Sequence, residues 1–335
     1  MQVIAHTDQQ CFDELHAEWS ALVPVSQANL IFSTPEWHKH WWAAYRSGQL
    51  WVLEVRADDR KLAGILPLFI EEQAERGNVA RIIGSDDVTD YLDIIAHCDH
   101  IDAVYEALAA FLSENRTQFD VLEFSNIREE SPTYKIFEQI LATCGYEVTL
   151  EQQEVCPLFS VPDSFDAYLE SLESKQRSEL KRKLRRAEGY DEMAWYIVGA
   201  EHNLDDELQA FLKLMAASHP EKAKFLQNPQ HIAFFNSFMP VAMEKGWLQL
   251  NFQVVEEERV ATYLNFDYNN DILVYNSGLA PNKFGSLSPG IVLLANNIQW
   301  AIDHKKHTFN FLRGNETYKY QMGGKDTHVF KLTAK

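Results

Sequence analysis

Apolar and polar positions in the first half of the chain alternate between strand-like and helix-like periods. Residues 50–57 and 61–70 are two apolar runs on either side of a polar turn, a pattern that predicts a β-hairpin. Apolar side chains recur every three or four positions over 102–114, which predicts a helix. A strand is expected over 119–124, and a further helix begins at about residue 132.

The second half of the chain repeats this order of elements. A hairpin is predicted from 248–255 and 259–268, then a helix over 289–304 and a strand over 307–312. The repeat indicates two copies of one α/β unit, joined near 150–163, although chance similarity between two hairpins would give the same pattern.

The predicted fold class is therefore mixed α/β (α+β) sheets in two tandem domains. The chain has 335 residues, and domains run to roughly 100–200 residues, so two domains also fit the length. We place the N-terminal domain at 1–155 and the C-terminal domain at 156–335.

The second half also has an element without a counterpart in the first. Residues 165–188 predict a helix whose end is strongly basic. Between residues 175 and 186 seven cations stand against one acid, Glu179, a local charge of +6 that leaves −25 for the rest of the chain. This helix either selects an anion or presents an ordinary solvated face. The cations are Lys175, Arg177, Lys181, Arg182, Lys183, Arg185 and Arg186.

Composition and charge exclude several classes of protein. The formal net charge of −19 argues against DNA binding and against docking on anionic membranes. No apolar run approaches the roughly 18 residues of a membrane span. The first residues lack the pattern of a signal peptide, and the four cysteines show no disulfide framework, so we expect a cytoplasmic protein.

The densest set of chemically active groups follows the last predicted strand of the repeat. Polar and ionisable side chains crowd the eight residues after that strand, beside a glycine turn. Strand ends of α/β sheets commonly carry functional groups at such positions. The set comprises Arg313, Glu316, Tyr318, Lys319 and Tyr320.

A second candidate is the start of the helix at residue 289. The preceding loop contains Gly285, Ser286, Ser288 and Gly290, and backbone N–H groups at a helix start attract phosphates. A well-capped helix without a ligand would show the same residues. Ser288 is not the nucleophile of a hydrolase elbow, because Pro289 after it has no N–H for an oxyanion hole.

Two further clusters in the first domain were considered. Asp90, Tyr91 and Asp93 could hold an amine or a sugar hydroxyl, or could be turn residues. His97-Cys98-Asp99-His100 contains metal-ligand residue types, but no second cluster completes a site. We therefore expect a surface loop there and no metal.

These motifs, taken in order, resemble a known family. Phe32-Ser33-Thr34-Pro35-Glu36-Trp37 is followed by Asp90-Tyr91-Leu92-Asp93, the basic helix, Ser288-Pro289-Gly290, and finally Phe309-Asn310-Phe311-Leu312-Arg313-Gly314 with Glu316-Thr317-Tyr318-Lys319. The order resembles that of the GNAT-like acetyltransferases of the CelD type, which are related to the Fem-type aminoacyltransferases.

The resemblance implies two tandem GNAT (acyl-CoA N-acyltransferase)-like domains, with the acyl donor in the second and the acceptor side in the first. It implies acyl-CoA, such as acetyl-CoA, as co-substrate. Its pantetheine would lie between the strands near Tyr275-Asn276 and Phe309–Leu312, and its pyrophosphate at Gly285–Gly290. The usual Q/R-x-x-G-x-G/A pattern is replaced here by Ser288-Pro289-Gly290, which removes one N–H donor.

Acyl transfer also needs a base and an acid. We expect Glu316 as the base, and Tyr318 or Tyr275 as the acid. Arg313 would anchor a substrate, unless it pairs with Glu316 and locks the turn. Cofactor-binding residues would be Asn276, Gly285, Ser286, Ser288 and Gly290, and substrate-binding residues would be Asp90, Tyr91, Asp93 and Lys319.

Three functions remain open at this level. The first is transfer of an acyl group from acyl-CoA to an amine or hydroxyl of a small molecule or an envelope polysaccharide precursor. The second is a Fem-like aminoacyltransferase with aminoacyl-tRNA as donor and the basic helix as its tRNA contact, against which the charge of −19 weighs. The third is a non-catalytic binding protein of a polysaccharide pathway. The oligomeric state is not readable from the sequence.

Overall fold

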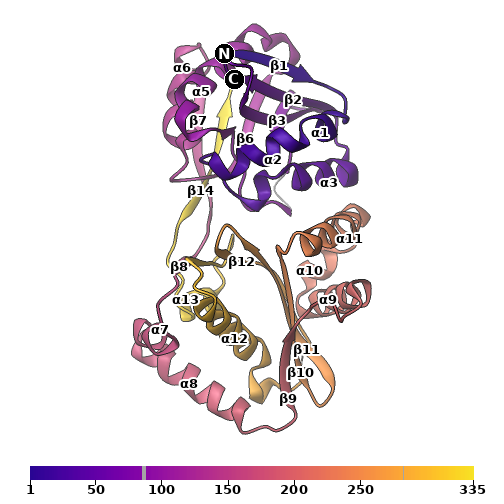
Figure 1. Cartoon of the computed structure of the whole chain (residues 1–335), viewed down its shortest axis with the longest axis vertical. Helices are drawn as coiled ribbons and strands as arrows, with labels where there is room; N and C mark the ends of the chain where they lie inside the picture. Colours follow the sequence, from indigo (N-terminus) through magenta and orange to yellow (C-terminus); the bar gives the residue numbers. More distant parts are fainter. Residues whose placement is uncertain (85–87, 282) are drawn as a thin grey trace. The chain divides into compact units, whose positions relative to one another are not determined.

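The chain folds into two compact units, each with a mixed β-sheet between layers of helices (Figure 1). The computed structural model describes residues 1–84, 88–281 and 283–335. Unit 1 comprises Met1–Val155 together with Thr327–Lys335, and unit 2 comprises Cys156–Asp326.

The sheet of unit 1 has the strand order β1-β2-β3-β4-β6-β14-β7, with β5 paired to β3. Its strands are β1 (Gln2–His6), β2 (Gln49–Arg56), β3 (Leu62–Gln73), β4 (Gly77–Ile82), β5 (Ile95–Ala96), β6 (Val121–Arg128), β7 (Val148–Val155) and β14 (His328–Ala334). Its α-helices are α1 (Cys11–Glu14), α2 (His16–Leu22), α3 (Pro35–Tyr45), α5 (Ile101–Glu114) and α6 (Glu138–Thr143).

Helices cover both faces of this sheet. On one face the apolar stripe of α5, including Leu108 and Leu112, packs on β1 and β2. On the other face α2 and α3 bury three tryptophans, Trp19, Trp37 and Trp41, which are almost inaccessible to solvent. The hairpin, helix and strand predicted for this half are therefore present, and the tryptophans belong to the core.

The C-terminal strand corrects the predicted domain boundary. β14 lies between β6 and β7 in the sheet of unit 1, although the sequence analysis placed it in the second domain. The residues of β14 alternate in burial as expected of a strand, but alternation does not reveal which strand will be the partner. Pairing across more than 170 residues, as between Val329 and Glu154, leaves no local signal.

Unit 2 contains a sheet with the order β8-β13-β12-β11-β10-β9. Its strands are β8 (Leu158–Ser160), β9 (Met193–Ile197), β10 (Leu248–Val255), β11 (Glu258–Tyr268), β12 (Asp271–Leu279) and β13 (Thr308–Asn310). Its α-helices are α7 (Phe165–Ser171), α8 (Ser174–Glu188), α9 (Leu204–Ser218), α10 (Pro220–Phe225), α11 (Pro229–Glu244), α12 (Pro289–Asp303) and α13 (Thr317–Gln321).

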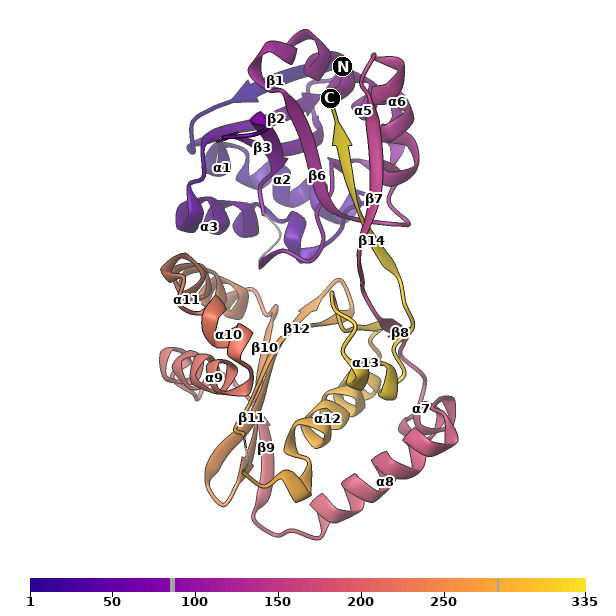
Figure 2. The same ribbon diagram turned by 180° about the vertical axis from the view of Figure 1, so that it is seen from behind.

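The helices of unit 2 also form two layers. Helices α9, α10 and α11 cover one face of the sheet, and α12 covers the other (Figures 1 and 2). Helix α9 lies so close to β12 that a Cβ on Gly278 would come within 2.5 Å of the main chain at Leu214 and Met215. The α12 face buries Leu293, Leu294 and other apolar side chains against β11 and β12.

The predicted helix over 165–188 is two helices. α7 ends at Ser171, and α8 begins at Ser174 after Leu172 and Glu173, whose ψ angles of 149° and 146° are extended. The apolar stripe does not show the break because Leu172 is buried on the same face as the rest of the stripe. In the described part of the chain, no helix combines the length and apolarity needed to cross a bilayer.

We expect a truncation of a core side chain in β14 to destabilise unit 1 and leave unit 2 unchanged. Leu332 is fully buried between β6 and β7, so Leu332→Ala should cost about 2–5 kcal/mol. Hydrogen exchange followed by mass spectrometry would assign the effect to peptides of each unit. Lys331→Ala, at a half-buried neighbour, should change stability by about 0.5 kcal/mol or less. Faster exchange in unit 2 alone would contradict this assignment of β14.

Candidate active site

The parallel strands β12 and β13 of unit 2 pair over a short distance and then separate. Their register joins Asp271–Leu273 to Thr308–Asn310, and β12 then continues to Leu279. After β13 the chain turns toward β8, where the Phe311 N–H donates to the carbonyl of Pro157 at 2.9 Å. Two adjacent strands therefore diverge at the centre of the sheet.

A β-bulge in β12 lies at the point of separation. Asn265 faces Val274 and Leu264 faces Asn276, so Tyr275 is the extra residue. The Tyr275 ring packs toward the helix layer, with ring centroids 6.1 Å from Phe235 and 5.0 Å from Phe266. Tyr275, one of the residues predicted to be catalytic, thus lies in an aromatic cluster, and its role as an acid stays a prediction.

The loop after β13 is held in an uncommon backbone conformation. Leu312 is buried with φ of 57°, and its N–H donates to the Asn310 side chain at 2.8 Å. Gly314 has φ of 113°, and a Cβ there would run into the carboxylate of Glu316. Non-glycine residues at positive φ are strained and recur at functional sites.

Lys319 holds this loop together. Its side chain is 3 % exposed, and Nζ lies 3.3, 2.6 and 3.2 Å from the carbonyl oxygens of Leu312, Arg313 and Gly314. The three donors of an ammonium group suffice for these three acceptors. Lys319 was predicted to bind substrate, and the structure shows it bonded within the loop, where it positions its neighbours.

Glu316 is the exposed carboxylate of this cluster. It lies at the N-cap position of α13, its side chain is 57 % exposed, and its Oε2 is 3.0 Å from Lys319 Nζ. Glu316 is therefore oriented by a buried cation at one side and open to solvent at the other. Arg313 and Glu316 belong to the same loop, as the sequence requires.

The half-buried Tyr318 and the buried Tyr263 add two hydroxyl groups to the cluster. Burial raises the pKa of Tyr318 well above its ordinary value, with smaller contributions from Tyr263 and the Glu316 carboxylate. Burial raises the pKa of Tyr263 as well, and Glu316 again adds to the effect. Both hydroxyl groups accordingly stay protonated at neutral pH and can donate hydrogen bonds.

Lys222 on α10 completes the cluster, and the sequence analysis did not identify it. Its Nζ donates to the carbonyl oxygen of Ser277 at 2.6 Å and to its hydroxyl at 3.2 Å, on β12 beyond the bulge. Burial lowers the pKa of Lys222 to about 8, against the opposing influence of Glu316; Lys319 lowers it further. Lysines on short helices are common, so no sequence pattern marks Lys222 as a site residue. Ser277 and Tyr263 lie within strands and likewise have no local signal that marks them as site residues.

The predicted phosphate-binding segment forms the start of α12. Residues Gly285–Leu287 are a short 3-10 helix, and a Cβ on Gly285 would meet open space. Ser288 is at the N-cap with φ of 53°; its carbonyl accepts from the N–H groups of Ile291 and Val292, both at 3.0 Å, and its hydroxyl makes no capping bond. Ser288 therefore caps α12 through its main chain and not through its side chain.

The corresponding edge in unit 1 is filled by the chain itself. β4 and β6 also pair in parallel over a short stretch, Val79–Arg81 with Val121–Glu123. Beyond it, Asn126 accepts from the Leu92 N–H at 3.1 Å and donates through its side chain to the Thr89 carbonyl at 2.8 Å. The segment from Thr89 to Leu92 thus occupies the edge that is open in unit 2.

Asp90, Tyr91 and Asp93 lie in or next to this segment, and all three are buried. Asp93 accepts from the Thr133 hydroxyl at 2.5 Å, and burial raises its pKa to about 6. Thr133 in turn lies 2.7 Å from the Tyr105 hydroxyl. The side chain of Asp93 is engaged in the interior of unit 1, and substrate binding by the three residues stays a prediction.

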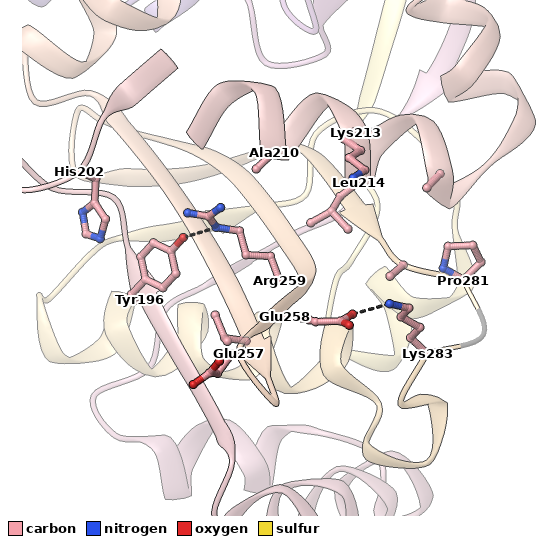
Figure 3. A pocket seen from close by; sticks show the side chains of 13 residues that line it. Tyr196, His202, Ala210, Lys213, Leu214, Glu257, Glu258, Arg259, Pro281 and Lys283 are labelled. Atoms are coloured by element: carbon pink, nitrogen blue, oxygen red, sulfur yellow. Dashed lines mark hydrogen bonds and ion pairs between the residues drawn. The ribbon is translucent and has the colours of Figure 1, made fainter. Parts of the chain in front are cut away.

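A cavity of about 940 Å³ lies on the α9 side of unit 2 (Figure 3). Arg259 donates from Nε to the Tyr196 hydroxyl at 2.7 Å, and Lys283 is paired with Glu258. None of Lys222, Glu316, Tyr318 and Lys319 is among its described lining residues. The volume of this cavity therefore does not make it the candidate active site, because the reactive side chains gather elsewhere.

Comparison with known proteins agrees with this geometry. Residues 174–320 match the family model described as an acetyltransferase (GNAT) domain. This part of unit 2 is therefore similar to GNAT acetyltransferase domains. No curated protein sequence matches the chain.

Solved structures extend the similarity to both units. The chain resembles FemX with a TM-score of 0.66 and 12 % identity, covering 99 % of this chain and 97 % of that one. It resembles L-PGS from Bacillus licheniformis with a TM-score of 0.55 and 11 % identity, covering 94 % and 90 %. It also resembles a tandem GNAT protein from the clavulanic acid biosynthesis pathway, with a TM-score of 0.52 and 12 % identity, covering 99 % of this chain and 98 % of that one. The predicted tandem GNAT-like fold is confirmed, and the matches do not distinguish the CelD type.

We expect Lys222 to react with amine-modifying reagents at lower pH than ordinary lysines. Its labelling midpoint should lie near pH 8, against about 10.4 for an unperturbed lysine. Because the Glu316 carboxylate raises the pKa of Lys222, Glu316→Gln should lower the midpoint further. Competitive labelling across pH with mass spectrometry would measure both values. A midpoint that does not respond to Glu316→Gln would contradict the electrostatic contact between the two groups.

Proposed function

We propose that the protein is an acyltransferase that moves an acyl group, such as acetyl, from a thioester of the acyl-CoA type to an amine or hydroxyl. The observation that carries the proposal is the gathering of Glu316, Tyr318 and Lys222 where β12 and β13 separate. Acyl transfer requires a base, an acid and a cation or dipole near the developing oxyanion, and these three residues can supply them.

In the proposed reaction Glu316 accepts the proton of the attacking nitrogen or oxygen. Its exposed carboxylate is reachable by an acceptor, and the ion pair with Lys319 fixes its direction. The nucleophile then attacks the thioester carbonyl, and the oxyanion of the tetrahedral intermediate forms. The positive charge of Lys222 beside Ser277 favours negative charge developing at this edge of β12.

Collapse of the intermediate breaks the C–S bond and leaves a thiolate that needs a proton. Tyr318 can donate it, since burial keeps its hydroxyl protonated. Tyr275, the other predicted acid, packs on Phe235 and Phe266. We therefore assign the acid to Tyr318, and propose Arg313 as the anchor for an anionic group of a substrate.

The donor is proposed to run along the free edge of β12 near Asn276 toward the start of α12. Open space beside Gly285 would let a phosphate approach the main chain, with Ser286, Ser288 and Gly290 around it. The acceptor class proposed is a small molecule or an envelope polysaccharide precursor in the cytoplasm. A Fem-like transfer from aminoacyl-tRNA is the second candidate, supported by the likeness in fold to FemX.

Replacing the base tests the proposal directly. Glu316→Gln should lower kcat by about 10²–10⁴-fold, because the amide cannot take the proton, while acetyl-CoA binding measured by calorimetry stays intact. Glu244→Gln, an exposed carboxylate on α11, is the matched control and should leave turnover unchanged. Unchanged turnover in Glu316→Gln would remove its assignment. Absence of both heat and thermal shift with acetyl-CoA would favour aminoacyl-tRNA or a non-catalytic role.

The acid assignment predicts a dependence on the leaving group. Tyr318→Phe should lower kcat by about 10²-fold with acetyl-CoA, and by much less with an acetyl thioester of a more acidic thiol, which leaves without a proton. Tyr275→Phe should leave the rate nearly unchanged with both donors. The opposite pattern, a loss in Tyr275→Phe and none in Tyr318→Phe, would move the acid to Tyr275.

A further inference from the structure

Helix α8 presents a row of cations to solvent. Leu180, Leu184 and Ala187 face the core of unit 2, at the spacing of one helix face. The opposite face carries exposed Lys181, Arg182 and Arg185, with Lys175 one turn and a half earlier. The helix runs next to α12 along the side of unit 2 (Figure 2). We call Lys175, Lys181, Arg182 and Arg185 the cationic row.

Most of this charge is not neutralised within the described residues. Glu179 pairs with Arg182 at 2.6 Å and approaches Lys183 at 3.8 Å. Arg185 Nε donates to the carbonyl of Lys181 at 3.3 Å, and in the described part of the chain no carboxylate pairs with Lys175, Lys181 or Arg185. On a chain of net charge −19, such a row is the feature that an acidic partner would recognise.

The cationic row adjoins the proposed donor path. Arg186, on the same helix, donates from Nη1 to the carbonyl of Ser286 at 2.6 Å and so links α8 to the start of α12. A cavity of about 250 Å³ lies between α8, the first turn of α12 and the end of α13. Its lining carries two cations and one acid among other side chains, and it comprises Lys175, Gln176, Glu179, Leu180, Lys183, Ile291, Gln321 and Met322.

The cavity is suited to a single anionic group with an attached chain. Lys175 and Lys183 supply two positive charges against the one negative charge of Glu179, and the amide N–H groups of Gln176 and Gln321 are donors in the same lining. α13 begins directly after Glu316 and ends at Gln321, so the cavity and the base lie at the two ends of one short helix. Pro289 removes an N–H donor that a pyrophosphate at the start of α12 would use.

We propose that the acyl donor is delivered as the phosphopantetheine thioester of an acidic carrier protein, which docks on the cationic row. This inference rests on the proposed function. The single phosphate of the prosthetic group would lie at the cavity between α8 and α12, a different place from the loop at Gly285 that the pyrophosphate of acyl-CoA would approach, and the thioester would reach Glu316. In the transfer step the acceptor nitrogen or oxygen forms a bond to the acyl carbon, the C–S bond breaks, the acceptor proton goes to Glu316, and the carrier leaves as its thiol.

The dimensions of the row favour a folded protein over tRNA. α8 has 15 residues, which span about 22 Å at 1.5 Å per residue, a length that one acidic helix of a partner can cover. The rest of the chain carries net negative charge. A long polyanion that extended beyond α8 would meet this negative charge, whereas a small acidic domain need contact only the row.

The test compares two donors and two triple variants. The donors are acetyl-CoA and a purified acyl carrier protein bearing acetyl-phosphopantetheine, and carrier binding is also measured by fluorescence anisotropy without turnover. The test variant is Lys181→Glu/Arg182→Glu/Arg185→Glu. The control variant is Lys213→Glu/Lys224→Glu/Lys245→Glu, on α9, α10 and the end of α11, which makes the same change in net charge on the other side of the sheet.

We expect the α8 variant to lose about 10²-fold or more in carrier affinity and in kcat/KM with the carrier donor, and less than about 3-fold with acetyl-CoA. The control variant should keep its carrier affinity and its kcat/KM with either donor. Turnover with acetyl-CoA but no carrier binding, or equal losses in both triple variants, would overturn the docking proposal and leave the acyltransferase intact. Carrier binding at α8 with no transfer from either donor would keep the docking surface and remove the proposed function. Binding of tRNA to the row in place of the carrier would overturn the proposal.

Discussion

The contacts of the buried Lys319 ammonium are the interactions on which the candidate active site of unit 2 depends. A lysine with 3 % exposure is costly unless its charge is compensated, and here three loop carbonyls and the Glu316 carboxylate surround it. The carbonyls converge because Leu312 and Gly314 adopt positive φ. The same contacts fix the start of α13, where Glu316 is the N-cap and Tyr318 lies in the first turn. The bonds of Lys319 therefore account both for the positive φ angles in the loop and for the orientation of Glu316 and Tyr318.

The two units differ at the edge beyond a short parallel strand pair, and this difference favours unit 2 as the site of the proposed chemistry. Both sheets contain a short parallel strand pair, β4 with β6 and β12 with β13. In unit 1 the edge beyond the pair is closed by hydrogen bonds between Asn126 and the segment Thr89–Leu92. In unit 2 the polar groups of Lys222 and the Lys319 loop gather at that edge instead. The two units thus differ in the groups that lie at this edge: a chain segment in unit 1, and ionisable side chains in unit 2.

The sequence predicts the elements and the C-terminal loop because both have local signals. The hairpins, α5, α12 and the cluster from Arg313 to Lys319 follow from periodicity and residue type. The place of β14 and the role of Lys222 do not, since each depends on a partner distant in sequence, such as Glu154 or Ser277. Lys319 has the residue type of a substrate ligand; its burial and its bonds to three loop carbonyls are visible only in the structure, and substrate binding by Lys319 stays a prediction.

Lys222 and Glu316 are linked by their charges, and this link bears on how the site works. Burial favours the neutral amine of Lys222, whereas the Glu316 carboxylate favours the ammonium, so its pKa of about 8 reflects the balance of the two. When Glu316 takes a proton from the acceptor, its support for the ammonium ends at the moment when an oxyanion appears nearby. The oxyanion replaces the carboxylate as the negative partner of Lys222. The charge around Lys222 therefore stays balanced through the proposed transfer, which is an advantage of placing the cation on α10, outside the loop that carries the base.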